Sequence, residues 1–398
     1  MSGTVLLTLT AVFAWNRVLP NHLRQLGADE AQVGLAFMIL ALAHRLPSVF
    51  GGLIADRLGR KRILVLATFL MAPMYLLAGF MHSWTGVLAA LTVAWFFSSF
   101  QGPAIITIVA EAVPEEKRGR AIGTLETFIM VAVCLGPWLG ARVIDLAGGL
   151  RNAMMILFVA TFFIYLLVGT IRGIGLVETR HTVERGSFRW VGWTSYGLLV
   201  FVGVTVYAVF FLSTDGPFFP MYAKDVIRLS DSGVADTAFL GGLAAVAAAM
   251  VGGWFTDRFG PPRVLLGCFV ALFLTLVPFA WSWWKGLPIS RFAPGLDLAL
   301  YVVWFVPGEI FTVAFHKQLT SSAPKSQRAL YVGLMGTATG VFASLANLIG
   351  GKLYLHQGPA APFGLGAACA ALGIGIALLL WKRTRSAKPV AVPAPAES

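Results

Sequence analysis

The chain has 398 residues, of which 58% are hydrophobic and only 12% are charged. Its mean hydropathy is +0.79, which excludes an ordinary soluble globular protein, because about a quarter of the residues in such proteins are charged. The net charge of +12 would suggest nucleic acid as a partner of a soluble protein, but we expect none, since cations at the inner face of a membrane protein give the same excess.

Apolar runs follow one another along nearly the whole chain. A bilayer crossing needs about 20 residues, so twelve crossings would use about 240 positions. The first run has no basic segment ahead of it, which favours a retained helix over a cleaved signal peptide. The expected spans are residues 4–23, 31–55, 62–81, 86–110, 119–142, 151–171, 192–222, 234–256, 263–284, 296–317, 328–351 and 361–381.

The loops between these spans differ in charge. One alternate set of connections, with the tail, holds 20 Lys and Arg residues, and the other set holds 8. Because positive residues concentrate on the cytoplasmic side, this bias places both termini in the cytoplasm and the chain in the plasma (inner) membrane. Residues 173–190 form a polar cytoplasmic linker, and residues 385–398, rich in Pro and Ala, form a disordered cytoplasmic tail.

A short polar hinge at residues 51–64 separates the second and third spans. Gly52 allows close helix packing because it lacks a Cβ, and Gly59 can take the positive φ of a sharp reversal. Around them lie one carboxylate, Asp56, and four cations, Arg57, Arg60, Lys61 and Arg62. The pattern recurs 201 residues later with Gly253, Asp257, Arg258 and Gly260 in the matching places. A copy half a chain later indicates a duplicated architecture.

The hinge resembles motif A of the major facilitator superfamily, G-x-L-x-x-D-R-x-G-R-K, with Ile54 in the leucine position. The resemblance covers residues 4–381 and implies an all-α polytopic membrane protein with twelve transmembrane helices. These would form two pseudo-symmetric six-helix bundles, residues 1–172 and 191–384, around a central cavity. The first, fourth, seventh and tenth spans would line the cavity, and the second, fifth, eighth and eleventh would lie along the boundary between the bundles.

The resemblance also implies a gate at the hinges. When the cytoplasmic side is shut, Asp56 would cap the start of span 328–351, and Asp257 would cap the start of span 119–142 near Arg118. Both carboxylates would meet the partial positive charge of a helix N-terminus. The alternative is that these residues only set the topology and a turn.

The fifth span carries a second signature in Gly123, Gly136, Pro137 and Gly140. These residues resemble the exporter motif of the superfamily, in which Ala132 and Ala141 here replace two glycines. We expect this small-residue surface to pack across the boundary between the bundles, with Gly336 and Gly340 as the partner surface. Such packing is common in any membrane bundle, so the motif favours export without deciding it.

The fourth span resembles the end of another superfamily motif, motif B, at Gln101-Gly102-Pro103-Ala104. The arginine of that motif would fall at position 98, where this chain has Ser98. Proton coupling through that arginine therefore does not transfer to this chain.

Ionisable residues inside a membrane are costly and are functional candidates by default. The substrate and coupling candidates are Arg17, Arg45, Gln101, Glu126, Asp215 and Glu309. Glu309 has no Lys or Arg within a turn of sequence, so we expect it to be protonated and to carry the coupled proton. Arg17 and Asp215 would form a pair that closes the outer side, or Arg17 would bind an anionic substrate directly. Any of these residues could instead belong to a buried structural pair.

Enzyme signatures are absent from the sequence: it has no H-E-x-x-H, no G-x-S-x-G and no P-loop lysine. Its cysteines, Cys134, Cys268 and Cys369, lie in apolar runs without metal-ligand spacing, so we expect no metal and no cofactor. We expect a monomeric secondary active transporter that moves a small organic or amphipathic solute by alternating access, as proton-coupled export. The alternatives are a proton-coupled importer of an organic anion and a non-transporting membrane receptor of the same fold.

Overall fold

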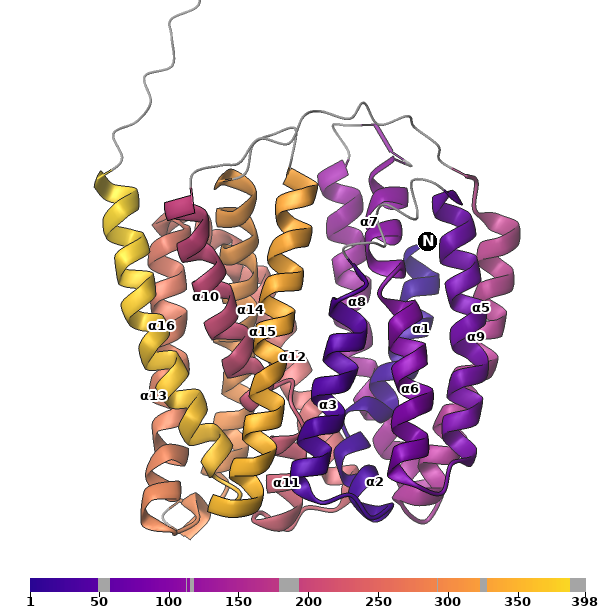
Figure 1. Cartoon of the computed structure of the whole chain (residues 1–398), viewed down its shortest axis with the longest axis horizontal. Coiled ribbons are helices and arrows are strands. Elements are labelled where there is room, and N and C mark those ends of the chain that lie inside the picture. The colour runs from indigo at the N-terminus through magenta and orange to yellow at the C-terminus, as the bar shows by residue number, and fades with distance from the viewer. Residues whose placement is uncertain are drawn as a thin grey trace, which may run out of the picture.

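A computed structural model describes residues 1–48, 58–111, 113–114, 118–178, 193–291, 293–322 and 328–386. These residues form two groups of helices that stand side by side (Figure 1). The N-terminal bundle contains α1 (Ser2–Asn16), α2 (Leu19–Gln25), α3 (Glu30–Arg45), α5 (Arg60–Phe80), α6 (Trp84–Ser98), α7 (Gln101–Glu111), α8 (Arg118–Leu146) and α9 (Leu150–Gly175). The C-terminal bundle contains α10 (Trp193–Leu212), α11 (Phe218–Asp225), α12 (Asp231–Phe259), α13 (Pro261–Lys285), α14 (Leu296–Ser322), α15 (Arg328–Gln357) and α16 (Ala361–Ser386), with a 3₁₀ turn η2 (Ile289–Arg291) before α14.

The predicted all-α, two-bundle membrane fold is confirmed. Each predicted span has a helical counterpart, and no strand occurs among the described residues. In this part of the chain, eight helices are long and apolar enough to cross a membrane, and the bent pair α1–α2 makes a ninth. The predicted linker and tail lie mostly outside the described residues, although α9 continues to Gly175 and α16 to Ser386.

Three spans that we predicted as continuous helices consist of two helices each, so that prediction was wrong. The pair α1–α2 bends by 45° just before Pro20, and α10 ends ahead of Pro217. The fourth span breaks between α6 and α7, ahead of Pro103. Proline lacks the N–H that a continuous helix needs, so a break on its N-terminal side is expected. The breaks at Pro20 and Pro217 interrupt the first span of each half of the chain, as duplication predicts.

The two hinge glycines adopt the backbone that the sequence predicts. Gly59 has a φ of +98° and Gly260 a φ of +79°. Each immediately precedes the helix that follows its hinge, α5 and α13 respectively. The end of the molecule where α5 and α13 begin is called the hinge end below, and the opposite end, where α2 and α11 lie, is called the α2–α11 end (Figure 1).

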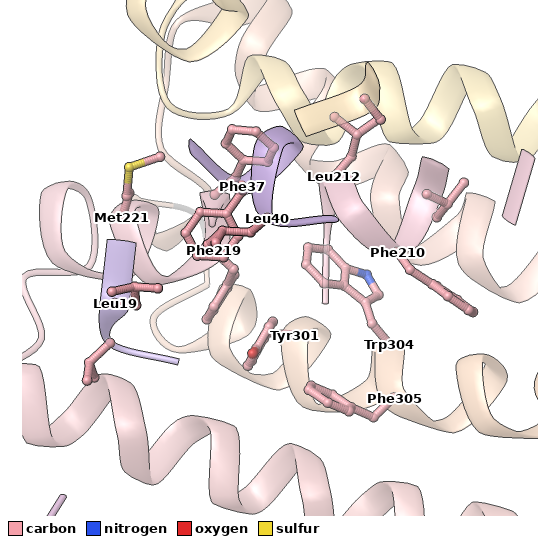
Figure 2. Packing of buried hydrophobic residues seen from close by; sticks show 14 of the residues in the cluster. Leu19, Phe37, Leu40, Phe210, Leu212, Phe219, Met221, Tyr301, Trp304 and Phe305 are labelled. Carbon is pink, nitrogen blue, oxygen red and sulfur yellow. The ribbon is translucent and has the colours of Figure 1, made fainter. Parts of the chain in front are cut away.

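The bundles pack tightly against each other near the α2–α11 end. A Cβ placed on Gly34 of α3 would lie 2.4 Å from the carbonyl oxygen of Asn347 on α15, so these helices meet backbone to backbone. Figure 2 shows Leu19 and Phe37 of the N-terminal bundle and Phe219 and Tyr301 of the C-terminal bundle, which belong to one buried hydrophobic cluster. The rings of Phe219 and Tyr301 stack with centroids 3.5 Å apart.

Candidate functional site

A cavity of about 510 Å³ lies between the two bundles. Its walls come from α1, α3, α6 and α8 on one side and from α10, α12 and α14 on the other, with the segment between α10 and α11. Large apolar side chains dominate the lining, and the polar exceptions are Asn16, Arg17, Arg45, Thr214, Asp215, Glu309 and Thr312. This volume suits a small organic molecule, and the walls suit one with both apolar and polar parts.

Arg17 and Asp215 form an ion pair across the cavity. Nη2 of Arg17 lies 3.3 Å from Oδ1 of Asp215, and Nη1 donates a hydrogen bond to the carbonyl oxygen of Thr214. The Arg17 side chain is 11% exposed, whereas that of Asp215 is 48% exposed. The break between α10 and α11 supplies both acceptors, because the carbonyl of Thr214 is not engaged in a continuous helix. The contact is therefore present, while its predicted role as a gate stays a prediction.

Arg45 and Glu309 also line the cavity. Cζ of Arg45 lies 5.8 Å from the ring centroid of Tyr207 on α10, which places the cation over an aromatic face of the other bundle. The aliphatic stem of Arg45 packs against Gly340 of α15, where an added Cβ would lie 2.5 Å from Cγ. Glu309 is half-buried, and among the described residues it has no hydrogen-bond or ion-pair partner.

Gln101 and Glu126, also predicted as substrate or coupling candidates, do not line the cavity. Gln101 is buried inside the N-terminal bundle, where Nε2 lies 3.4 Å from Oγ1 of Thr68 and 3.1 Å from Sδ of Met71. Glu126 is exposed, although the next turn of α8 contributes Ile129 to the cavity wall. Sequence position alone does not give the rotation of a helix, which decides whether its side chains face a cavity.

Arg172 is a buried cation that we had counted only among the charges of the loops. It lies in the last turn of α9 and is 1% exposed. Nη1 donates to Oγ1 of Thr68 at 2.9 Å and Nε to Oγ1 of Thr4 at 3.2 Å, and Nη1 also lies 3.4 Å from Oε1 of Gln101. A guanidinium therefore reaches Gln101 although position 98 is a serine. The sequence contained one indication that Arg172 is buried, because it lies only one residue beyond the predicted apolar run 151–171.

A charged network joins the bundles at the α2–α11 end. Arg24 of α2 donates to both carboxylate oxygens of Asp225 on α11, at 2.9 and 3.0 Å, and to Glu30 of α3 at 2.9 Å. Tyr354 of α15 donates to Asp225 at 2.7 Å. Also near this end, α8 and α12 are joined by an ion pair in which Arg142 lies 2.6 Å from Asp236.

In the sequence, Arg24 and Arg142 contribute only to the count of loop charges, and nothing there singles out their carboxylate partners. One signal could have found the first contact. Arg24 and Asp225 are 201 residues apart, the same offset as Asp56 and Asp257. Positions related by a duplication meet each other where they lie close to the symmetry axis between the halves. Arg17 and Asp215, at a separation of 198, follow nearly the same rule.

Comparison with known families identifies this architecture. The family model described as Major Facilitator Superfamily matches residues 1–306 and 206–398, which together span the whole chain. The chain belongs to the Major Facilitator Superfamily. Membership of this family of transporters confirms that the chain is a multi-pass membrane protein and not an enzyme.

Several relatives of this superfamily member are drug-resistance proteins. The chain is 28% identical over 280 residues to the multidrug resistance protein MdtG of Dickeya zeae (strain Ech586), covering 66% of this chain and 65% of that protein. It is 27% identical over 280 residues to a multi-drug resistance efflux pump PmrA homolog of Lactococcus lactis subsp. lactis (strain IL1403), covering 66% of each chain. The matches thus span about two thirds of these relatives.

Solved structures of the superfamily share the fold. A bacterial homolog of the human lysosomal transporter Spinster, in an inward-facing and unoccupied conformation, has a TM-score of 0.76 at 14% identity over 98% of each chain. A mutant of the peptide transporter POT has a TM-score of 0.77 at 14% identity, covering 96% of this chain and 93% of that one. Both comparisons support the two-bundle fold.

In the first copy of motif A, Gly52, Asp56 and Arg57 lie outside the described residues, whereas the second copy lies within them. Asp257 forms an ion pair with Lys317 of α14, within its own bundle, and the predicted cap on the start of α8 stays a prediction. Arg258 lies over the ring of Trp254, with Cζ 5.2 Å from its centroid. Arg60 of the first copy is buried. An added Cβ on Gly253 would meet nothing within 4 Å, so close packing does not explain that glycine.

The exporter-like glycines of α8 pack inside the N-terminal bundle, so the prediction that they pack across the boundary was wrong. An added Cβ on Gly140 would lie 2.0 Å from the carbonyl oxygen of Ala14 on α1, and one on Gly136 would lie 2.5 Å from Cβ of Phe13. Pro137 lies between them in α8, and the side-chain surroundings of position 123 are outside the described part. Cys134, on another face of α8, meets Gly242 of α12 at the boundary, 3.0 Å from an added Cβ to Sγ.

Proposed function

We propose that the chain is a secondary active transporter that moves a small organic or amphipathic solute by alternating access. The cavity between the bundles carries this proposal, because both bundles contribute its walls and relative motion of the bundles would therefore change access to it. The ion pairs at the α2–α11 end are the contacts that such motion would break and re-form. We propose that the protein acts as a monomer in the plasma membrane, with the hinge end in the cytoplasm.

The chemistry of the cavity favours amphipathic solutes. Aromatic side chains such as Trp95, Tyr207 and Phe305 offer flat apolar surfaces, while the charged side chains are two cations and two carboxylates. Arg17 is already engaged by Asp215, and ionised Glu309 balances the charge of Arg45, so in this deprotonated form the cavity carries no excess positive charge for an organic anion. This balance favours export of varied amphipathic solutes over import of an organic anion, and the names of the multidrug relatives agree with it.

Glu309 is the proposed proton carrier. It lines the cavity on α14 and lacks a cationic partner among the described residues, so taking up or releasing a proton changes the net charge of the cavity. Coupling requires a group of this kind, because proton binding and substrate binding must influence each other through the same cavity.

Transport by purified protein in proteoliposomes tests the proposal, with ethidium as the amphipathic probe. Preloaded vesicles should show counterflow, and an imposed proton gradient should drive accumulation opposite to proton movement. Glu309→Gln should lose gradient-driven accumulation but keep counterflow. Asp297→Asn is the matched control, since Asp297 is a buried carboxylate of the same helix that does not line the cavity.

Three results would contradict parts of this proposal. Absence of counterflow with the probe and with a panel of organic anions would support a receptor. Movement of an organic anion together with protons would support import. Accumulation by Glu309→Gln against a gradient would remove Glu309 from coupling and make Asp215 the next candidate.

A further inference from the structure

A second hollow, of about 520 Å³, lies between α12, α13 and α14 of the C-terminal bundle. Its lining is apolar apart from Arg263, and includes Phe259, Val264, Gly267, Val303 and Ile310. Phe259 is 43% exposed and Val303 is 45% exposed, so this groove opens to the surroundings of the bundle. The central cavity lies on the other face of α14, where Gly308 and Glu309 line it.

One end of the groove is basic. Arg263 lines it in the first turn of α13, and Arg258 lies in the last turn of α12 on the other side of Gly260. Each guanidinium lies over an aromatic ring: Cζ of Arg263 is 5.7 Å from the ring centroid of Trp381, and Arg258 lies over Trp254. These cations are at the hinge end, while the apolar wall continues along α13 to Ala271, about 12 Å deeper in the bundle.

We propose that this groove is a binding site for an anionic phospholipid, with one acyl chain in the groove and the phosphate at Arg263 and Arg258. The apolar wall matches a hydrocarbon chain, and basic residues at a helix end match an anionic headgroup on the cytoplasmic side of a membrane. An added Cβ on Gly267 would meet nothing within 4 Å, so the floor of the groove has space that this glycine leaves open.

The position of the groove connects lipid binding to the central cavity. Pro307 and Ile310 of α14 line the groove, and the residues between them, Gly308 and Glu309, line the cavity. Pro307 has no N–H, so the carbonyl of Val303 lacks its usual helical donor and this turn of α14 is less firmly held. A lipid chain in the groove packs directly behind the turn that carries Glu309.

Native mass spectrometry of the full chain tests this site, after exchange into mixed micelles containing equal amounts of phosphatidylglycerol and phosphatidylcholine. The wild-type protein should retain one phosphatidylglycerol. Gly267→Leu should lose the retained lipid, because the new side chain fills the groove. Arg263→Gln should reduce the preference for phosphatidylglycerol over phosphatidylcholine about fivefold, as expected for one interfacial cation.

Matched variants control for general effects. Gly375→Leu places the same side chain at a glycine of α16 whose added Cβ would also meet nothing within 4 Å. Lys285→Gln removes a cation that lies over Trp284 at the opposite end, 4.1 Å from its centroid. Both should retain lipid like the wild type. Phosphatidylglycerol with a photoreactive acyl chain should crosslink to peptides of α13 and α14, and Gly267→Leu should abolish this crosslink.

Two outcomes would overturn the proposal. If Gly267→Leu, folded and monodisperse, retains as much phosphatidylglycerol as Gly375→Leu, the retained lipid is bound elsewhere. If Gly267→Leu leaves lipid unchanged but alters the oligomeric state, the groove is an interface with a second copy. Because no transport is measured, a negative result leaves the proposed transport function untouched.

Discussion

At the scale of single residues, Arg17 makes the most informative contact of the cavity. Its guanidinium is shared between the carboxylate of Asp215 and the carbonyl of Thr214, both on the far bundle. Such a contact can exist only while the bundles are close at this level. Pairing offsets the cost of the buried cation in that state alone, so the pair has the property of a switch.

A charge exchange tests whether Arg17 and Asp215 act as a pair. Asp215 is 48% exposed, so we expect the ion pair to contribute about 1 kcal/mol, or about a fivefold change in a population. Arg17→Asp and Asp215→Arg should each lower transport in proteoliposomes, and the double variant should recover much of the loss. If the double variant is as inactive as Arg17→Asp and no longer binds the transported probe, Arg17 belongs to the substrate site.

At the scale of helices, glycine positions set how closely α8 approaches its neighbours. Gly136 and Gly140 lie against the backbone or first side-chain atoms of α1. At the boundary between the bundles, Cys134 of α8 packs against Gly242 of α12. One helix thus uses two faces: a glycine face that fixes it within its own bundle, and a second face that meets the other bundle. The first contact stabilises the bundle, and the second is available for motion.

Gly140→Ala should destabilise the protein. The new Cβ would lie 2.0 Å from a backbone oxygen of Ala14, and a backbone atom cannot move aside as a flexible side chain can. We expect a loss of about 1–3 kcal/mol, as for other overpacked sites, measured as a lower thermal unfolding temperature in detergent. Gly375→Ala, with open space around its Cβ, should be neutral or slightly stabilising because alanine favours helix. Equal unfolding temperatures for the two variants would show that α1 and α8 are not tightly packed.

At the scale of the whole molecule, the α2–α11 end is held together by a charged network and an aromatic cluster. Arg24 links α2 to both α11 and α3, and Tyr354 of α15 binds the same carboxylate of Asp225. Asp225 therefore accepts two hydrogen bonds from the N-terminal bundle and a third from its own bundle. Its removal should favour the state in which this end is open.

Asp225→Asn should increase labelling of a cysteine placed at Phe211, which lines the cavity, by a membrane-impermeant maleimide from the α2–α11 side. A partly exposed charged contact of this kind contributes about 1 kcal/mol, so we expect an increase of about fivefold. Asp231→Asn is the control, because Asp231 pairs with Lys224 at the same end but within one bundle. Equal labelling in both variants would mean that the network does not hold this end closed.

The sequence by itself determined the features that depend on local composition and on duplication. Apolar runs of bilayer length gave the spans, and the repeated hinge gave the two bundles. The need for a sharp reversal gave the positive φ of Gly59, which Gly260 shares at the repeated hinge. These features follow from the chain alone, because the bilayer fixes helix length and the turn geometry is local.

Only the tertiary structure decided which side chains meet. The positions of Arg17, Arg45, Asp215 and Glu309 along the predicted spans placed these residues within the membrane. All four line one cavity. Gln101, which was named from its resemblance to motif B, faces the interior of its own bundle beside Arg172. Depth follows from a rise of about 1.5 Å per residue, but the direction of a side chain depends on how each helix is rotated against its neighbours, and packing between distant segments sets that rotation.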